Sequence, residues 1–253
     1  MITETALKAN LAQVQERIAA AAARAGRSPE EITLVAVTKT HPPELVATAF
    51  RLGICHFGEN RVEEGNPKIE AVRRLLGSTE QSATSNQQRA TSNEQPIWHM
   101  IGHVQSRKAR QVVAAPYALI HSVDRLRIAH RLERFAAELG KVLDILLEVN
   151  VGREESKYGF LPEEMSAIVP AIVELPHLRI RGLMTVAPIM EEAKQVRPVF
   201  ATLRQLRDQL RTDYPDQDWH HLSMGMTDDF EVAVEEGATI VRIGRAIFGP
   251  REE

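Results

Sequence analysis

The sequence predicts an α/β fold in which eight parallel strands close into a single (β/α)8 barrel of the TIM type, with an extra helix at its N-terminus. Short segments rich in β-branched residues alternate with longer segments whose apolar residues recur about every 3.6 positions. The short segments also start at nearly regular intervals, and the length of 253 residues suits one such barrel. An open, doubly wound sheet is the alternative that the same alternation allows.

The first 26 residues predict an amphipathic helix, and they lack the basic, apolar and small segments of a signal peptide in that order. No apolar run in the sequence reaches the roughly 18 residues that a membrane-spanning helix needs. Cys55 is the single cysteine, which excludes an intramolecular disulfide and a zinc site built on cysteines. A cytoplasmic protein is therefore expected.

Eight segments after this helix are predicted as strands. They are Thr33–Lys39, Cys55–Asn60, Ile97–Gly102, Leu119–Asp124, Val142–Asn150, Ile180–Val186, Trp219–Met224 and Thr239–Gly244. Stretches of helical period lie between them, and the clearest are Glu44–Leu52, Arg125–Leu139 and Ala193–Arg211. Alternation of strand and helix predicts parallel neighbours, and eight regular units favour a closed barrel over the open sheet.

One interval between predicted strands is longer than its neighbours, because residues 55 and 97 lie 42 positions apart. It contains Gly77–Gln95, a tract of 19 residues whose only apolar members are two alanines and which holds two near-identical repeats. Such a tract cannot bury enough apolar surface to offset the entropy of ordering it. It is therefore predicted as a disordered loop insertion within a single domain, 1–253. A partner-binding role as a scaffold is the alternative.

The composition gives no support for a nucleic-acid partner. Lys and Arg number 31 against 34 Asp and Glu, so the formal net charge is −3, and aromatic residues make up 5%. A nucleic-acid-binding surface needs clustered basic charge and often rings on which bases stack. Neither nucleic acid nor membrane is expected as a partner. No dedicated interface is evident either, so a monomer is expected.

The carboxyl ends of the strands should carry the functional site, as in other barrels of this type. Lys39 follows the apolar run Leu34–Val37, which places it at the mouth of a buried strand. A lysine beside an apolar barrel can have a lowered pKa and act as a Schiff-base nucleophile. The alternative is a lysine that reaches solvent from the end of a strand.

Two further segments have the character of phosphate-binding turns. Leu222–Phe230 joins a strand to a helix through a hydroxyl and a glycine, and Val241–Gly249 joins the last strand to a short helix. Backbone N–H groups at such turns bind anions, and phosphate sites after the seventh and eighth strands recur in these barrels. Ordinary turns are the alternative for each segment alone. Together with Lys39 they suggest an aldehyde that carries a phosphate, and pyridoxal 5′-phosphate (PLP) fits that description.

The sequence resembles the pyridoxal phosphate homeostasis proteins. The resemblance covers residues 33 to 249 but not the tract Gly77–Gln95. It rests on the segments Val35–Thr40, Phe57–Asn60, Trp98–Gly102, His121–Arg125, Glu155–Gly159, Arg181–Met184, Leu222–Asp229 and Val241–Gly249. It implies a PLP-binding barrel like the N-terminal domain of alanine racemase, the arrangement called PLP fold type III.

The resemblance also implies roles for individual residues. Lys39 would form the internal aldimine with PLP, and Arg242 would face the pyridine nitrogen. Lys157 would lie near the cofactor entrance as a second basic group, with an exposed loop lysine as the alternative. The residues implied to bind the phosphate are Ser223, Gly225, Met226 and Gly244. The residues implied to line the cofactor pocket are Asn60, His99 and Met184, of which the last two could also be packing residues of the barrel.

An arginine beside the pyridine nitrogen disfavours protonation of the ring, which weakens it as an electron sink. The sequence also leaves no room for the second domain with which alanine racemase completes its active site. We therefore expect, as the resemblance implies, a PLP-binding protein of vitamin B6 and amino- and keto-acid homeostasis without established turnover and without a metal. PLP-dependent apoenzymes are candidate partners. A monomeric amino-acid racemase and a Schiff-base aldolase acting on a sugar phosphate are the alternatives.

Overall fold

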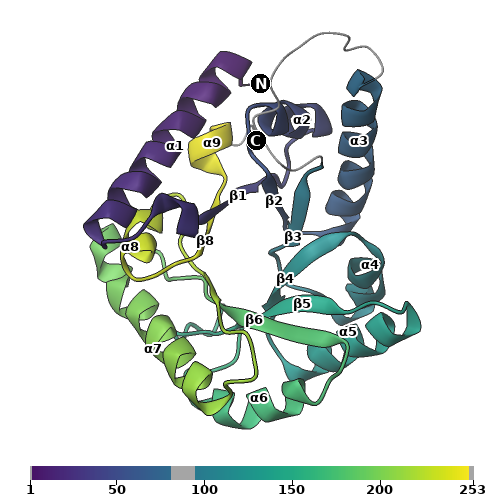
Figure 1. Ribbon diagram of the computed structural model, residues 1–253, viewed down its shortest axis with the longest axis vertical. Helices are drawn as coiled ribbons and strands as arrows, with labels where there is room; N and C mark the ends of the chain where they lie inside the picture. Colours follow the sequence, from purple (N-terminus) through teal and green to yellow (C-terminus); the bar gives the residue numbers. More distant parts are fainter. Residues whose placement is uncertain (1, 81–94, 251–253) are drawn as a thin grey trace.

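The computed structural model describes residues 2–80 and 95–250, in which eight parallel strands form a closed barrel (Figure 1). Each strand pairs with the next, and the last strand pairs with the first through Thr33–Ile240 and Val35–Arg242. The strands are β1 Thr33–Val37, β2 His56–Glu59, β3 Ile97–Met100, β4 Tyr117–Val123, β5 Leu143–Glu148, β6 Leu178–Met184, β7 His221–Ser223 and β8 Ile240–Ile243. The closed barrel is confirmed, and the open sheet is excluded.

Helices surround the barrel on the outside. The α-helices are α1 Glu4–Arg24, α2 Pro43–Arg51, α3 Val62–Glu80, α4 Ala109–Ala114, α5 Leu126–Glu138, α6 Met165–Val173, α7 Arg197–Asp213, α8 Phe230–Glu235 and α9 Arg245–Phe248. Within the described ranges, four 3-10 helices accompany them, η1 Pro29–Glu31, η2 Ser106–Lys108, η3 Pro162–Glu164 and η4 Ala193–Val196. Each predicted helical stretch overlaps an observed helix, and the predicted strands differ from the observed ones by a few residues at their ends.

The long interval between β2 and β3 begins as a helix. Helix α3 continues to Glu80, so the first four residues of the tract Gly77–Gln95 are helical instead of part of a loop. Helix α3 also carries Pro67, which lies in its second turn. Residues 81–94, where disorder was predicted, lie outside the described residues.

The core has two parts, because successive side chains of a strand point to opposite faces of a sheet. The larger part lies between strands and helices and includes Ala36, Phe57 and Leu183. The smaller part fills the inside of the barrel. Its buried apolar members are Val35, Leu119, Leu146, Met184 and Ile240. The inward positions of the remaining strands carry polar residues, which the site below uses.

The N-terminal helix α1 packs along the outside of the barrel against α8 and α9 (Figure 1). Thr3 caps its start, because the Thr3 hydroxyl accepts from the N–H of Ala6. Asn10 donates to the carbonyl of Ile247 at 3.0 Å, and Arg17 pairs with Glu231 at 3.2 Å. The helix thus covers the seam where the last strand meets the first.

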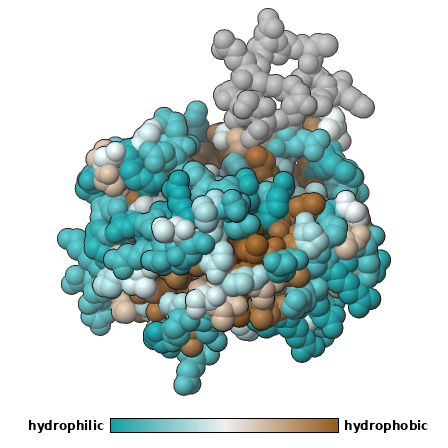
Figure 2. Space-filling model, turned by 60° about the horizontal axis from the view of Figure 1, so that its bottom comes forward, coloured by the Kyte–Doolittle hydropathy of each residue, from teal (hydrophilic) through white to brown (hydrophobic). Residues whose placement is uncertain are grey.

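The face shown in Figure 2 is mostly hydrophilic, with hydrophobic residues visible between the polar ones. In residues 2–80 and 95–250, no helix has the length and apolar character that would let it cross a membrane.

Candidate functional site

Lys39 lies in the turn at the carboxyl end of β1 and is partly buried. Both neighbouring residues are fixed by hydrogen bonds. The buried Thr38 hydroxyl donates to Glu59 Oε1 at 2.6 Å, and the backbone N–H of Thr40 donates to Glu64 Oε1. Thr40 has a φ of 67°, in the left-handed region that non-glycine residues rarely adopt. The turn that presents Lys39 is therefore held in a defined and costly conformation.

Lys68 of α3 connects these two anchors of the Lys39 turn. Its Nζ donates to the carbonyl of Thr38 at 2.6 Å and to Glu59 Oε1 and Glu64 Oε1 at 2.8 Å each. The Lys68 and Glu59 side chains are 6% and 0% exposed, so this is a buried ion pair. Burial raises the pKa of the Glu59 carboxyl, against the opposing effect of Lys68. Lys68 is thus the cation that makes this buried carboxylate tolerable.

Arg242 points into the barrel from β8 and is 4% exposed. Its Nη1 donates to the carbonyl and the hydroxyl of Ser223 at 2.8 and 2.6 Å, and its Nη2 donates to the carbonyl of Thr185 at 2.9 Å. Burial lowers the pKa of Arg242 to about 10, while Glu148 and Asp229 oppose that shift. The guanidinium is consequently a fixed cation at the carboxyl ends of β6, β7 and β8.

The loop after β7 makes a tight turn at Gly225, whose φ is 93°. A Cβ there would lie 2.6 Å from the Cβ of Ala233 and 2.9 Å from the Cα of Phe230, so only glycine fits. The N–H of Met226 donates to Asp229 Oδ1 at 2.6 Å. That N–H, predicted as a phosphate contact, therefore already has a carboxylate acceptor inside the loop.

The hydroxyl of Ser223, also predicted to bind phosphate, is fully buried and lies 2.6 Å from Arg242 Nη1 and 2.9 Å from His121 Nδ1. It faces the inside of the barrel and not the loop. The loop itself carries another hydroxyl, that of Thr227, which is partly exposed and was not singled out from the sequence. Gly244 caps the start of α9 and lies against the end of β1, since a Cβ on it would be 3.3 Å from the carbonyl of Val37.

Two of the residues implied to line the cofactor pocket, Met184 and His99, are buried inside the barrel. Met184 is 1% exposed and belongs to the apolar cluster inside the barrel. His99 is 4% exposed and lies between two other rings, with His56 at 2.9 Å and His121 at 3.0 Å. Both occupy the packed interior below the Lys39 turn. The signal that could have found the three histidines is their position, since each falls at an inward position of β2, β3 or β4.

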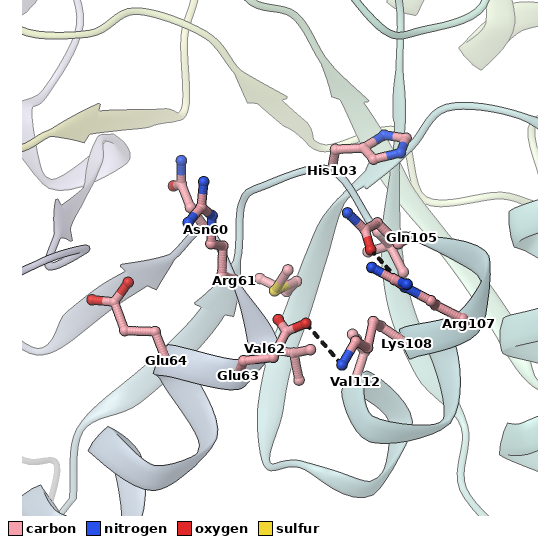
Figure 3. Close-up of a pocket in the computed structure, with 12 residues that line it drawn as sticks. Asn60, Arg61, Val62, Glu63, Glu64, His103, Gln105, Arg107, Lys108 and Val112 are labelled. Atoms are coloured by element: carbon pink, nitrogen blue, oxygen red, sulfur yellow. Dashed lines mark hydrogen bonds and ion pairs between the residues drawn. The ribbon is translucent and has the colours of Figure 1, made fainter.

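Asn60 lines a cavity of about 510 Å³ between the loops that follow β2 and β3 (Figure 3). Arg61, His103 and Arg107 contribute to the same wall, and Glu63 pairs with Lys108 at 2.9 Å across it. The backbone of Asn60 explains why residue 102 is a glycine, because a Cβ on Gly102 would lie 2.2 Å from the Asn60 carbonyl oxygen. Asn60 thus lies at the mouth of the barrel, beside the loop that follows β3.

Lys157 lies in the loop after β5 and is partly exposed. Asn150 holds this loop, because its Nδ2 donates to the carbonyl of Glu154 at 2.9 Å. Tyr158 stacks on His103 with ring centroids 3.7 Å apart. The loop therefore reaches across to the loop after β3 and carries Lys157 at the rim of the mouth.

Two carboxyl groups that the sequence analysis did not single out lie at the ends of β4 and β5. Asp124 and Glu148 are each 6% exposed, and Arg125 donates to both oxygens of Asp124 at 2.7 Å. Burial, with a contribution from Asp124, raises the pKa of Glu148 to about 7, although Arg242 opposes the shift. Glu148 is therefore a buried acid that gains and loses its proton near neutral pH. Within the described residues, no group of side chains could hold a metal ion.

We expect Glu148→Gln to stabilise the protein at pH 8 and to leave its stability at pH 4 nearly unchanged. Since the folded-state pKa of about 7 exceeds the ordinary 4.5, the folded state binds more protons between these values and stability falls as pH rises through them. The cost of the charged form above pH 7 is about 3 kcal/mol. Urea unfolding at pH 8 and pH 4 measures the change in the free energy of unfolding, with Glu155→Gln at an exposed position as the control. An equal effect at both pH values would contradict the assignment.

The chain carries a lysine in the turn after β1 and a buried arginine on β8. The family model described as "Alanine racemase, N-terminal domain" matches residues 3–252, so the chain is a barrel of that class. The curated relatives narrow this class further. The pyridoxal phosphate homeostasis protein of Escherichia coli (strain K12) is 44% identical over 248 residues, covering 96% of each chain. That of Aquifex aeolicus is 41% identical over 242 residues, covering 96% of this chain and 97% of the relative. The chain belongs to the pyridoxal phosphate homeostasis protein family.

Solved structures agree with this placement. PipY of Synechococcus elongatus, determined with PLP bound, has a TM-score of 0.73 and 33% identity over 93% of this chain and 100% of its own. The PLP-free structure of PipY has a TM-score of 0.76 and 35% identity, over 93% of this chain and 99% of its own. Alanine racemase from Corynebacterium glutamicum shares the fold, with a TM-score of 0.67 at 14% identity over 98% of this chain and 62% of the enzyme.

Proposed function

We propose that the chain binds PLP at the carboxyl ends of its strands and serves in the homeostasis of this cofactor. The curated relatives carry that name, and the related PipY has been determined with PLP bound. The observation in this chain that carries the proposal is the pairing of Lys39 at the end of β1 with the buried Arg242 on the adjacent β8. PLP supplies an electrophilic aldehyde and an aromatic ring that accepts electrons.

The residues of the site fit such a ligand. Lys39 would attack the aldehyde carbon through its amine, and loss of water would leave a Schiff base between Nζ and that carbon. Arg242 would face the ring nitrogen and keep it unprotonated, since two like charges at short range are costly. This arrangement supports binding over turnover, which agrees with the name of the curated relatives.

The phosphate would lie between the loop after β7 and the start of α9. Gly225 and Gly244 let the backbone approach closely there, and Thr227 contributes a partly exposed hydroxyl. The Ser223 hydroxyl supports this site from below through Arg242. We therefore propose Thr227, in place of the Ser223 hydroxyl, as the side chain that contacts the phosphate.

We further propose that the protein works as a cytoplasmic monomer that passes PLP to apoenzymes. Exposed large hydrophobic side chains lie on one side of the mouth, on the loops after β5, β6 and β7. They are Tyr158, Ile189, Met190 and Met226. These side chains offer a contact surface beside the site from which PLP would leave.

The decisive experiment is borohydride reduction of the protein after incubation with PLP, followed by peptide mapping. We expect one phosphopyridoxyl label, on Lys39, together with a visible absorbance before reduction. Lys39→Ala should remove both signals, whereas Lys157→Ala should keep them, since Lys157 lies on the rim. A label on another lysine, or none on the unaltered chain, would overturn the proposal.

A further inference from the structure

Five polar side chains cross the inside of the barrel from the carboxyl end of β8 to the amino end of β2. The Arg242 Nη1 donates to Ser223 Oγ at 2.6 Å, and His121 Nδ1 lies 2.9 Å from the same oxygen. His121 Nε2 is 3.0 Å from His99 Nδ1, and His99 Nε2 is 2.9 Å from His56 Nδ1. The inner members are between 0 and 4% exposed, and His56, the first residue of β2, is partly exposed.

The direction in which these side chains donate their hydrogen bonds follows from Arg242, because a guanidinium only donates hydrogen bonds. Ser223 Oγ accepts from it, so the buried hydroxyl proton needs an acceptor of its own. His121 Nδ1 is within hydrogen-bond distance of that oxygen, and a buried hydroxyl left without an acceptor would cost free energy. The hydroxyl therefore donates to His121 Nδ1, and that ring carries its proton on Nε2.

The same reasoning repeats at each following ring. His121 Nε2–H donates to His99 Nδ1, and His99 Nε2–H donates to His56 Nδ1. A second proton on either buried ring would remove an acceptor from the chain. On His121 it would also place a positive charge near Arg242 from β8, and on either ring a positive charge near His221 from β7. Burial already lowers the pKa of His99 to about 3. The rings are consequently neutral.

We infer that His56, His99 and His121 form a one-directional hydrogen-bond chain, oriented by Arg242 through Ser223, and that His121 positions Arg242 toward the cofactor ring. Every donor in this chain points away from Arg242, so the chain cannot deliver a proton toward the cofactor site unless all its links reverse. The orientation of these hydrogen bonds rests only on the distances and burial of the five side chains. Only the meaning of Arg242 as a cofactor contact rests on the proposed function.

Nuclear magnetic resonance of the full chain with 15N-labelled histidine, recorded without PLP at pH 7.5, tests the orientation. We expect all three rings to be neutral and protonated on Nε2 only, with resonances assigned through single His→Gln variants. An Nδ1–H tautomer or a doubly protonated ring at any of the three would overturn the inference. This measurement needs no change to Arg242 or Ser223.

Arg242 variants test the cause of the orientation. Arg242→Lys keeps a cationic donor and should keep the Nε2–H tautomers. Arg242→Met should give a mixture of tautomers at His99, which lies two hydrogen bonds beyond Ser223, the side chain that Arg242 contacts. Unchanged His99 resonances in a folded Met variant would overturn the role of Arg242. If the Met variant does not fold, Ser223→Ala serves instead, since it should shift the His121 Nδ1 resonance by removing its donor; no shift there would also overturn the inference.

The positioning role is read from bound PLP. In the PLP-loaded protein, His121→Leu should shift the visible absorbance band, and His121→Gln, whose amide can accept and donate in the same places, should restore it. An unchanged band in the Leu variant would refute the positioning role. Failure of the unaltered chain to bind PLP would refute the proposed function and leave the tautomer result as it stands.

Discussion

Lys68→Met should lower the free energy of unfolding by about 3–5 kcal/mol, because it removes one partner of a buried ion pair. Glu59, with its side chain fully buried, would keep the hydrogen bond from Thr38 and lose its countercharge. One of its oxygens, Oε2, already has no hydrogen-bond partner, so the remaining carboxylate would be poorly compensated. Urea unfolding at pH 7 gives the difference.

The matched control for this prediction is Lys108→Met. Lys108 pairs with Glu63 of the same helix α3 at 2.9 Å, but the two side chains are 24% and 52% exposed. Such a pair contributes about 0–1 kcal/mol. If the two variants lose similar stability, the contacts of Lys68 do not stabilise the turn that carries Lys39. A second variant, Lys68→Met with Glu59→Gln, should recover part of the loss because it removes the buried charge.

The second large effect is a loss of stability in acid that arises from the histidines inside the barrel. Burial lowers the pKa of His99 to about 3, from an ordinary value of 6.5. Between these values the unfolded chain binds the proton and the folded chain does not, so stability falls as pH falls below 6.5. For His99 alone the loss is about 3 kcal/mol by pH 4.5 and about 4 kcal/mol by pH 3. His121, with a strongly lowered pKa, acts in the same direction.

Glu148 acts in the opposite direction over part of this range, because its pKa is raised to about 7. The His99 contribution is therefore measured as a difference between variants. Urea unfolding of the unaltered chain and of His99→Gln at pH 7.5 and 4.5 should show a weaker pH dependence in the variant. His130→Gln, at an exposed position of α5, is the control. Parallel pH profiles for the unaltered chain and His99→Gln would contradict the prediction.

The architecture could be predicted from the sequence because its signals are local. Eight short apolar segments alternate with stretches of helical period, and the barrel is the closure that places every one of them between two neighbours. Lys39 and Arg242 could be placed at the strand ends for the same reason. The ends of strands were less certain, since Lys39 and Asn60 continue an extended pattern in the sequence but lie beyond β1 and β2 in the structure.

The interior of the barrel could not be predicted in the same way. His56, His99 and His121 come from segments separated by more than twenty residues, and only the stagger of neighbouring strands brings their rings within 3.0 Å. The direction of the Ser223 hydroxyl could not be predicted for the same reason, because it depends on Arg242 and His121 across the barrel. Lys68 escaped notice since it lies inside a helix, where a lysine is ordinarily exposed.

The seam between the first and last strands determines the order in which the fold can be completed. Asn10 and Ile247, which are joined by a hydrogen bond, are 237 positions apart, and β1 finds its second partner only in β8. Contacts of such sequence separation form late, since the entropy of closing the chain must be overcome first. During synthesis, β1 and the apolar face of α1 stay without their C-terminal partners until nearly the entire chain has been made. A barrel that still lacks β8 exposes this apolar surface and is the state most prone to misassociation.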